Sequence, residues 1–331
     1  MEIPEIVDYI INFTEDPVVE LSLINKYFNR QVRTIRITDN SNYLDIEDKH
    51  LALLPNLLTI NTARTHRITD VGLRGLTNLT SLCCRNNRIT DDAVSTLINL
   101  TKLSVHNKLI TDEGISSLTK LKILHLSKDK ITDNGLVNLT NLTDLELIDD
   151  CAITDKGLLN MPNLKHLFIM NYFLVTNGGI SKLTNLTSLS LCNTMISDIS
   201  ALTNLTNLSM MDVPDLLNIS MLTNLIKLEI GDGCCLDGKQ ISSLTNLTTL
   251  ELDHHVTDEN ISNLTNLTTL GLTADSRITL AGISHLPIKK FFINEIEIDK
   301  KLKLALAALE QLKQQDIVWK EISTLGMFVF K

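Results

Sequence analysis

Residues 131–148 read Ile-Thr-Asp-Asn-Gly-Leu-Val-Asn-Leu-Thr-Asn-Leu-Thr-Asp-Leu-Glu-Leu-Ile and contain the two phrases that decide the fold. The later phrase, Leu-Thr-Asn-Leu-Thr-x-Leu-x-Leu, returns throughout the chain at intervals of 19 to 22 residues. Its first positions are Leu54, Leu76, Leu97, Leu118, Leu139, Met161, Leu183, Leu202, Leu222, Leu244, Leu264 and Leu286. The earlier phrase, Ile-Thr-Asp, stands between copies at residues 68–70, 89–91, 110–112, 131–133 and 153–155. Copies that share one phase predict a repeat array.

Each part of the repeat predicts one local structure. The x-Leu-x-Leu-x segment, as at residues 81–85, alternates with period two and predicts a short strand with one buried face. The Thr-Asp pair predicts a helix start, with its side-chain oxygens capping free backbone N–H groups. Residues 70–76 should therefore form a short helix or turn opposite the strand. One coil cannot bury its own leucines, so successive coils must stack.

This pattern resembles the leucine-rich repeat, which implies an α/β solenoid. We expect a horseshoe with a concave parallel sheet and short convex helices or turns over residues 34–294. About 12–13 repeats fit this range, because Ile35 and Ile37 predict a partial extra strand before the first full copy. The repeats at 183–222 are shorter and resemble the internalin style. Residues 196–202 leave no room for a full helix, so we expect a turn or 3₁₀ segment there.

The N-terminal residues 1–33 are not a repeat. They contain Ile-Pro-Glu-Ile at 3–6, an apolar ladder to Phe13, an Asp-Pro break at 16–17 and Leu-Ser-Leu-Ile-Asn-Lys-Tyr-Phe at 21–28. This segment resembles an F-box, with Ile3 in place of the leading Leu and Ile24-Asn25 in place of Val-Cys. The resemblance implies docking on a Skp-type adaptor of a cullin ubiquitin ligase. The contacts would fall on Ile3, Pro4, Ile6, Ile10, Leu21, Leu23, Ile24 and Phe28. The alternative is that these helices only cap the first coil.

The C-terminal residues 295–331 predict a helical cap. Residues 299–312 form an amphipathic pattern, apolar at positions 302, 305, 306, 309 and 312. Sealing the last coil is the simpler interpretation, and a partner-binding helix is the alternative.

Composition argues against several classes of function. The 30 basic and 39 acidic residues give a formal charge of −9, and no long basic run is present, so nucleic acid is not an expected partner. No stretch approaches 18 uninterrupted apolar residues, and the N-terminus lacks a basic, apolar leader, so we expect neither a membrane span nor secretion. The expected location is cytoplasmic, with a host cytoplasm or a nucleus left open.

The cysteines and one tripeptide each have a plain structural interpretation. The six cysteines lack Cys-x-x-Cys spacing, which predicts reduced thiols and no metal site. They are Cys83, Cys84, Cys151, Cys192, Cys234 and Cys235. Asn-Leu-Thr recurs, for example at 78–80, 185–187 and 246–248, as a formal glycosylation acceptor. We interpret it as part of the repeat, because its middle Leu should be buried.

No combination of residues predicts catalysis or a cofactor. His106, His125 and His166 fall at outward strand positions but occupy different columns of the sheet, and no Gly-rich phosphate loop is present. We therefore expect no enzyme activity and no bound cofactor.

The aromatic residues predict a binding surface. Between residues 44 and 285 the only aromatics are Phe168, Tyr172 and Phe173, in a repeat one residue longer than the three repeats from 76 to 138. An exposed cluster of this kind is typical of interface anchors. On the same face we place the remaining predicted contacts: Met170, Ile148, Met211, Glu146 and His125. The alternative is that the bulge packs on itself.

Outward charges should run from basic near Arg85 and Lys102 to acidic near Glu229 and Glu251 and so orient a protein partner. The leading hypothesis is the substrate-recognition subunit of a cullin-type ubiquitin ligase that holds an unknown protein on the concave face. The alternative is a ligase-independent scaffold, or a pathogen or viral effector that sequesters a host protein.

Overall fold

The computed structural model describes residues 34–36, 47–52, 54–61, 67–85, 88–149, 151–213, 219–234, 236–252, 256–272, 277–293 and 296–297. The chain divides into two compact units, Met1–Asn204 and Leu205–Lys331. The F-box-like segment 1–33, with all eight predicted adaptor contacts, lies outside the described residues. So does the predicted C-terminal cap, apart from two residues of a final strand.

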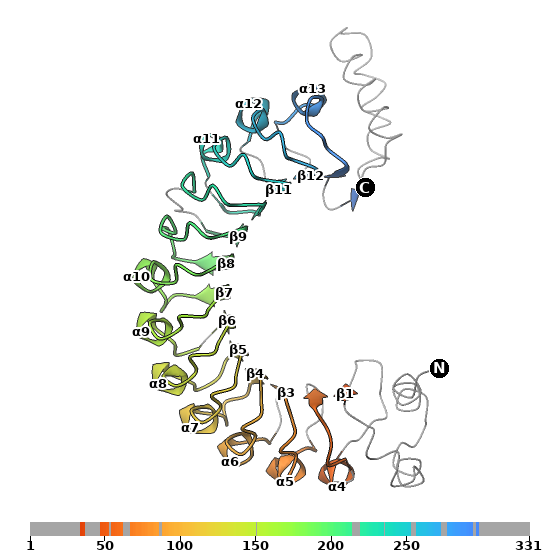
Figure 1. Ribbon diagram of the computed structural model, residues 1–331, viewed down its shortest axis with the longest axis vertical. Coiled ribbons are helices and arrows are strands. Elements are labelled where there is room, and N and C mark those ends of the chain that lie inside the picture. The colour runs from red at the N-terminus through yellow and green to blue at the C-terminus, as the bar shows by residue number, and fades with distance from the viewer. Residues whose placement is uncertain are drawn as a thin grey trace, which may run out of the picture. The chain divides into compact units, whose positions relative to one another are not determined.

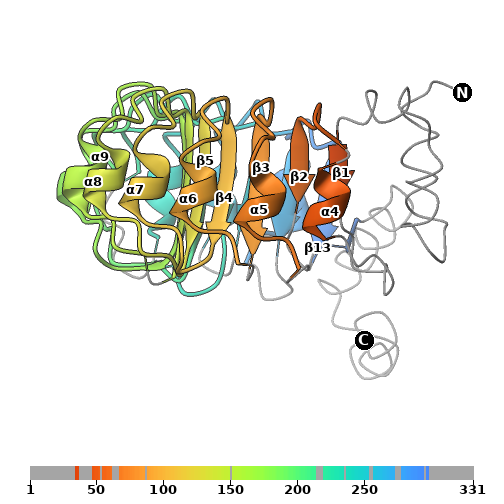
Figure 2. The same cartoon turned by 90° about the horizontal axis from the view of Figure 1, so that it is seen from below.

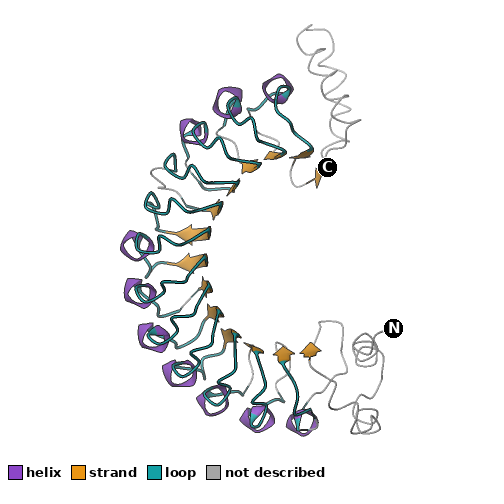
Figure 3. Cartoon of the chain, viewed as in Figure 1, coloured by secondary structure: helices purple, strands orange, loops and turns teal. Residues whose placement is uncertain are grey.

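The first unit alternates short strands with single-turn helices. Its strands are β1 (Thr34–Arg36), β2 (Thr59–Asn61), β3 (Ser81–Arg85), β4 (Lys102–His106), β5 (Ile123–Ser127), β6 (Asp144–Ile148), β7 (His166–Tyr172) and β8 (Ser188–Thr194). Its helices are α4 (Asp48–Leu51), α5 (Asp70–Leu73), α6 (Asp91–Val94), α7 (Asp112–Ile115), α8 (Asp133–Leu136), α9 (Asp155–Leu158) and α10 (Asn177–Ile180). Each strand pairs in parallel with the next (Figure 1). Strands and helices of this unit lie on opposite sides of the coils (Figures 2 and 3).

The second unit again combines short strands with single-turn helices, but it has fewer described helices than strands. Its strands are β9 (Asn207–Met211), β10 (Lys227–Ile230), β11 (Thr249–Leu252), β12 (Thr269–Leu272), β13 (Lys290–Ile293) and β14 (Ile296–Glu297). Its helices are α11 (Gly238–Ile241), α12 (Asp258–Ile261) and α13 (Leu280–Ile283). Strands β9 to β13 are parallel, whereas β14 turns back antiparallel to β13. The predicted leucine-rich-repeat sheet is confirmed, including β1 as an extra N-terminal strand. The antiparallel β14 was not predicted.

The alternating leucines form the core. In β6 the inward Leu145 and Leu147 are buried, while the outward residues between them are half-exposed. The middle residues of the Asn-Leu-Thr phrase, Leu79, Leu186 and Leu247, are fully buried. Period-two burial confirms the strand prediction, because a strand sends successive side chains to opposite faces.

The shortened coil is also confirmed. Residues 195–206, between β8 and β9, contain turns and no helix. The Asp198 carboxylate accepts hydrogen bonds from the N–H and the hydroxyl of Ser200, which closes the turn without a helical ladder.

The Ile-Thr-Asp phrase forms a polar link between repeats. The Thr132 hydroxyl accepts from the Asn134 N–H and so caps helix α8. The same threonine donates its N–H and hydroxyl to the Asp112 carboxylate of the preceding repeat, at 2.7 and 2.6 Å. The predicted threonine cap is confirmed. A capping role for the aspartate is wrong, because its carboxylate faces the next repeat rather than its own helix.

The carboxylate–threonine ladder continues through most helical repeats. Its pairs are Asp48–Thr69, Asp70–Thr90, Asp91–Thr111, Asp112–Thr132, Asp133–Thr154, Asp155–Thr176 and, in the second unit, Asp258–Thr279. In all but one of these pairs, a glycine three residues after the threonine makes room for the aspartate of the preceding repeat. A Cβ on Gly135 would lie 2.6 Å from Asp112 Oδ1 and 3.2 Å from Asp112 Cα. Only a very small side chain fits, and Ala93 takes the equivalent place in α6.

The Leu-Thr-Asn-Leu-Thr phrase supplies a second set of links. The Asn141 Nδ2 donates to the Thr119 carbonyl at 2.8 Å, and the Asn185 Nδ2 donates to the Pro162 carbonyl at 2.9 Å. The Thr143 hydroxyl donates to the Lys122 carbonyl at 3.2 Å. The asparagines and threonines of this phrase therefore bond the repeat before them, which supports the structural interpretation of Asn-Leu-Thr.

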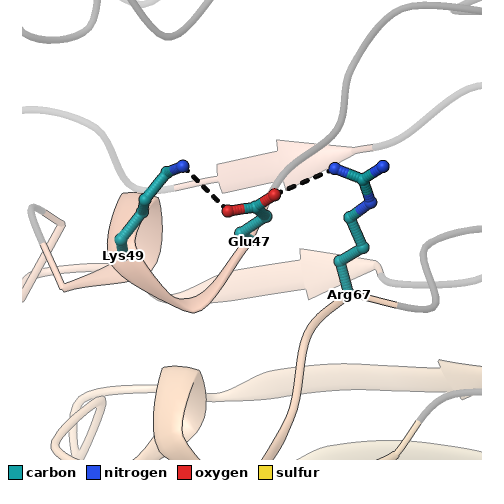
Figure 4. A network of polar contacts seen from close by, with 3 residues as sticks. All are labelled: Glu47, Lys49 and Arg67. Carbon is teal, nitrogen blue, oxygen red and sulfur yellow. Dashed lines mark hydrogen bonds and ion pairs between the residues drawn. The ribbon is translucent and has the colours of Figure 1, made fainter.

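One charged contact joins the first two described repeats. Glu47 binds the Lys49 ammonium at 2.8 Å and the Arg67 guanidinium at 2.9 Å (Figure 4). Hydrogen bonds from Lys49 and Arg67 hold the pKa of Glu47 below its ordinary value. These groups are solvent-exposed, so screening by water leaves the contact a weak contributor to stability.

The ladder predicts a graded response at Asp133. Asp133→Ala removes two charge-assisted acceptors from Thr154 and should lower the free energy of unfolding by about 2 kcal/mol. Asp133→Asn should lose less, because an amide can also make this link. Asn177 accepts from the Ser197 N–H of the following repeat and donates its own Nδ2–H to the Ser197 hydroxyl. Urea unfolding followed by circular dichroism measures both. Equal losses in the two variants would contradict the ladder.

Candidate partner-binding surface

An exposed apolar group lies just beyond strands β7 and β8. Phe173, Leu174 and Met195 are 53%, 52% and 71% exposed, and we call them the rim patch. Tyr172 is in register with Thr194, so Phe173 and Met195 occupy equivalent positions in adjacent repeats. Large apolar side chains that stay exposed side by side are unfavourable unless something covers them.

Three of the predicted face residues lie on the strands that precede this patch. Phe168 is in register with Glu146, and Met170 is in register with Ile148. Phe168, Met170 and Ile148 are half-buried on the outward side of the strands. Together with the rim patch they make up the candidate surface, which the first unit forms by itself.

Tyr172 is not part of this surface, and its prediction as an exposed anchor is wrong. The side chain is 2% exposed, and its hydroxyl donates a hydrogen bond to the Ile153 carbonyl of the preceding repeat. Burial raises the pKa of Tyr172 above its ordinary value. The ring enters the core because Asn171, with a φ of 51°, breaks the period-two alternation of β7. Position 172 therefore turns inward, where the alternation alone would turn it outward. Tyr172 therefore holds the loop that presents Phe173 and Leu174.

Sequence reasoning missed Met195 and left Leu174 out of the predicted contacts. A signal for Met195 was present, since it follows Leu186 by nine residues as Phe173 follows Leu164. The unpredicted part was that Asn193, like Asn171 in β7, has a positive φ that breaks the alternation of β8, so Thr194 is buried and Met195 exposed.

A row of polar side chains supports the ends of the strands. The row consists of Lys128 directly after β5, Asp149 directly after β6, and Asn171 and Asn193 as the second-last residues of β7 and β8. Each has a φ between 49° and 56°. The Lys128 ammonium lies 3.4 Å from Asp149 Oδ2, Asn171 Nδ2 donates to Asp149 Oδ1, and Asn193 Nδ2 donates to Asn171 Oδ1. We call this the rim ladder. It links four successive repeats beside the rim patch.

His125 and Glu146 form a pair at the acidic side of the surface. The His125 Nδ1 lies 3.1 Å from Glu146 Oε2. Burial lowers the pKa of His125 despite the nearby carboxylate, with Lys102 acting in the same direction. Because desolvation is the largest influence, His125 is neutral at physiological pH and the contact is a hydrogen bond to a charged Glu146.

The other predicted histidines lie apart from this pair. Burial and the neighbouring Arg85 lower the pKa of His106 to about 4, so it is uncharged at neutral pH. His166 is exposed at the start of β7. Within the described ranges, no group of three or more His, Cys, Asp or Glu residues is placed to hold a metal ion.

The second unit carries Met211, which the sequence had placed with the aromatics. Met211 is 49% exposed at the end of β9. On β10 and β11, Glu229 is in register with Glu251, and Lys227 pairs with Glu229 at 2.5 Å. In the first unit, Arg85 and Lys102 are exposed and Asp144 and Glu146 half-exposed, so its face changes from basic to acidic along the repeats as predicted.

One carboxyl group of the first unit is buried. Asp129 is 6% exposed, accepts from the Ile131 N–H at 2.9 Å and contacts the Cys151 Sγ at 3.7 Å. Burial raises the pKa of Asp129 to about 6 and that of Cys151 to about 12. Cys151 therefore stays a neutral thiol that packs in the core.

No described helix combines the length and apolar character needed to cross a bilayer.

The fold has solved counterparts although the sequence has no close match. No protein-family model matches the chain, and a search of curated proteins gives no match. The chain is similar to an internalin, InlF, from Listeria monocytogenes, with 23% identity, a TM-score of 0.57, and 81% of this chain and 91% of that chain covered. The functional domain of InlJ from the same organism follows at 19% identity, TM-score 0.51 and coverages of 74% and 60%. TLR13, in a complex with ssRNA13, has 18% identity, TM-score 0.51 and coverages of 78% and 53%. These identities establish the leucine-rich-repeat fold alone.

Substitution of Tyr172 should lower stability to a degree that depends on whether the hydroxyl alone or the whole ring is removed. Tyr172→Phe leaves the buried Ile153 carbonyl without the phenol donor and should cost about 1–2 kcal/mol of unfolding free energy. Tyr172→Ala adds a cavity and should cost about 3–5 kcal/mol. Chemical denaturation measures both. A Phe variant as stable as the wild type would show that the hydroxyl does not tie the loop down.

Replacing the Asp129 carboxyl group by an amide should increase stability in a pH-dependent way. Its folded pKa of about 6 exceeds the ordinary value of ~3.9, so the folded state holds the extra proton and stability falls as pH rises from about 4 to about 6. Asp129→Asn should therefore be more stable than the wild type at pH 7.5, by roughly 2 kcal/mol, and no more stable at pH 4. Urea midpoints at both pH values give the difference. A gain that is independent of pH would refute the buried-carboxyl assignment.

Proposed function

We propose that this chain is a non-catalytic binding protein that holds a protein partner on the candidate surface of its first unit. The observation that carries the proposal is the exposure of Phe173, Leu174 and Met195, with the half-buried Phe168 on the strand that leads to them. Exposed aromatic and methionine side chains that adjoin one another are typical of interface anchors.

The support beneath the patch favours the same function. The rim ladder and the buried Tyr172 fix the strand ends before any partner arrives. A preformed surface loses little conformational freedom on binding, so more of its contact energy appears as affinity. Charged residues on β6 would then orient the partner.

Introducing a charge into the rim patch supplies the test. Phe173→Asp and Met195→Asp should each reduce capture of the partner at least tenfold, since a buried carboxylate at an interface is strongly unfavourable. Leu159→Asp is the matched control, because Leu159 is 57% exposed just after α9, on the helix side of the coils.

The measurement is affinity capture from cell extract with quantitative mass spectrometry, followed by calorimetry with the purified partner. Thermal melting of each variant confirms folding. Binding that survives both rim variants but fails in Leu159→Asp would move the site to the helix side.

The finer proposal is that the chain recruits substrates to a cullin-type ubiquitin ligase through a Skp-type adaptor. It is supported by the sequence pattern of residues 2–35 alone. The chain would work by proximity, raising the effective concentration of a substrate lysine near the ubiquitin-loaded enzyme. The second candidate is a ligase-independent scaffold or a pathogen effector that sequesters a host protein, which the internalin-like short coils favour.

Adaptor binding separates the two candidates. The purified chain and a purified Skp-type adaptor should co-elute in size-exclusion chromatography if the ligase role holds. Leu23→Asp should abolish co-elution, and Phe173→Asp should leave it intact. Absence of a complex with the wild-type chain would reject the ligase role and leave the scaffold.

A further inference from the structure

The candidate surface constrains the shape and charge of what it binds. We propose that the partner segment is an amphipathic α-helix lying across strands β6, β7 and β8, with cationic side chains over β6. This inference rests on the proposed binding function and specifies the chemistry of the partner.

The spacing of the apolar side chains favours a helix. They form two rows whose members lie one repeat apart: Ile148 and Met170 on β6 and β7, and Phe173 and Met195 beyond β7 and β8. Neighbouring strands lie ~4.8 Å apart, close to the ~5.4 Å rise of one helical turn. An extended segment crossing the strands would repeat every ~6.8 Å on one face and fall out of step. Side chains at i, i+4 and i+7 of a helix would lie over β6, β7 and β8, and two of them at a time match the two members of a row.

The hydrogen bonds of the surface also disfavour an extended segment. Strands β6 and β7 are paired on both sides, so their backbone groups are used within the sheet. In the rim ladder, the Asn171 amide donates to Asp149 and accepts from Asn193. An extended peptide needs partners for its own N–H and C=O groups, whereas a helix satisfies these internally.

Charge gives the helix a direction. Strand β6 and the residue after it carry Asp144, Glu146 and Asp149, while the segment Ser188–Thr194 of β8 carries no charged residue. Lys128 offsets Asp149. The neutral His125 leaves the charge of Glu146 uncompensated. Lys or Arg side chains should therefore lie at the β6 end of the bound helix and only apolar or neutral ones at the β8 end.

Peptide selection tests this inference with defined probes. A displayed library of random peptides of about 16 residues, roughly 24 Å as a helix, is selected on the full chain. Binders to the Phe173→Asp/Met195→Asp double variant are removed in each round. The recovered peptides should show apolar residues at i, i+4 and i+7 with Lys or Arg at one end. Synthetic versions should gain helical circular dichroism when the chain is added.

Variants of Glu146 test the charge. Glu146→Lys should weaken the selected peptides at least tenfold and Glu146→Gln about threefold in fluorescence anisotropy, and Glu229→Gln on β10 is the matched control. Proline-rich or extended binders, acidic binders, failure to recover patch-dependent peptides, or affinities unchanged by Glu146→Lys would each overturn the proposal. If partner capture in extract still depends on Phe173 while the peptides are not helical, the binding function stands and the helix inference fails.

Discussion

The carboxylate–threonine ladder on the helix side is the contact on which the repeats depend. Each aspartate carboxylate accepts two hydrogen bonds from the threonine one repeat later, as Asp133 does from Thr154. The same threonine caps its own helix. A single hydroxyl thus joins local helix formation to stacking between coils.

The strand side uses different links and leaves a different surface. The rim ladder and the Tyr172 hydroxyl hold the ends of β7 and β8, and the apolar residues beyond them remain exposed. On the helix side the polar groups link the repeats to one another, whereas on the rim the polar groups support exposed apolar side chains. Rigid support beneath exposed aromatic and methionine side chains is the property expected of a binding surface rather than of a reaction centre.

Electrostatics refines this description. His125 and His106 are uncharged at neutral pH because burial lowers their pKa values, so the acidic side of the surface keeps the charge of Glu146. The buried Asp129 has a raised pKa, which makes its charged form a cost to stability near neutral pH. In this unit, the surface charge of Glu146 therefore bears on partner binding, whereas the buried carboxyl of Asp129 bears on stability.

Local periodicity was enough to predict the strands, the threonine caps, the extra strand β1 and the helix-free coil at 195–206, because each depends on residues adjacent in the chain. The direction of the Asp112 carboxylate, the burial of Tyr172 and the exposure of Met195 depend on groups a full repeat away, namely Thr132, the Ile153 carbonyl and the Asn171 side chain that binds Asn193. Period and composition are properties of the chain. Which side chain faces which neighbour is decided only when one coil is stacked on the next, because the leucine core fixes register and register fixes direction.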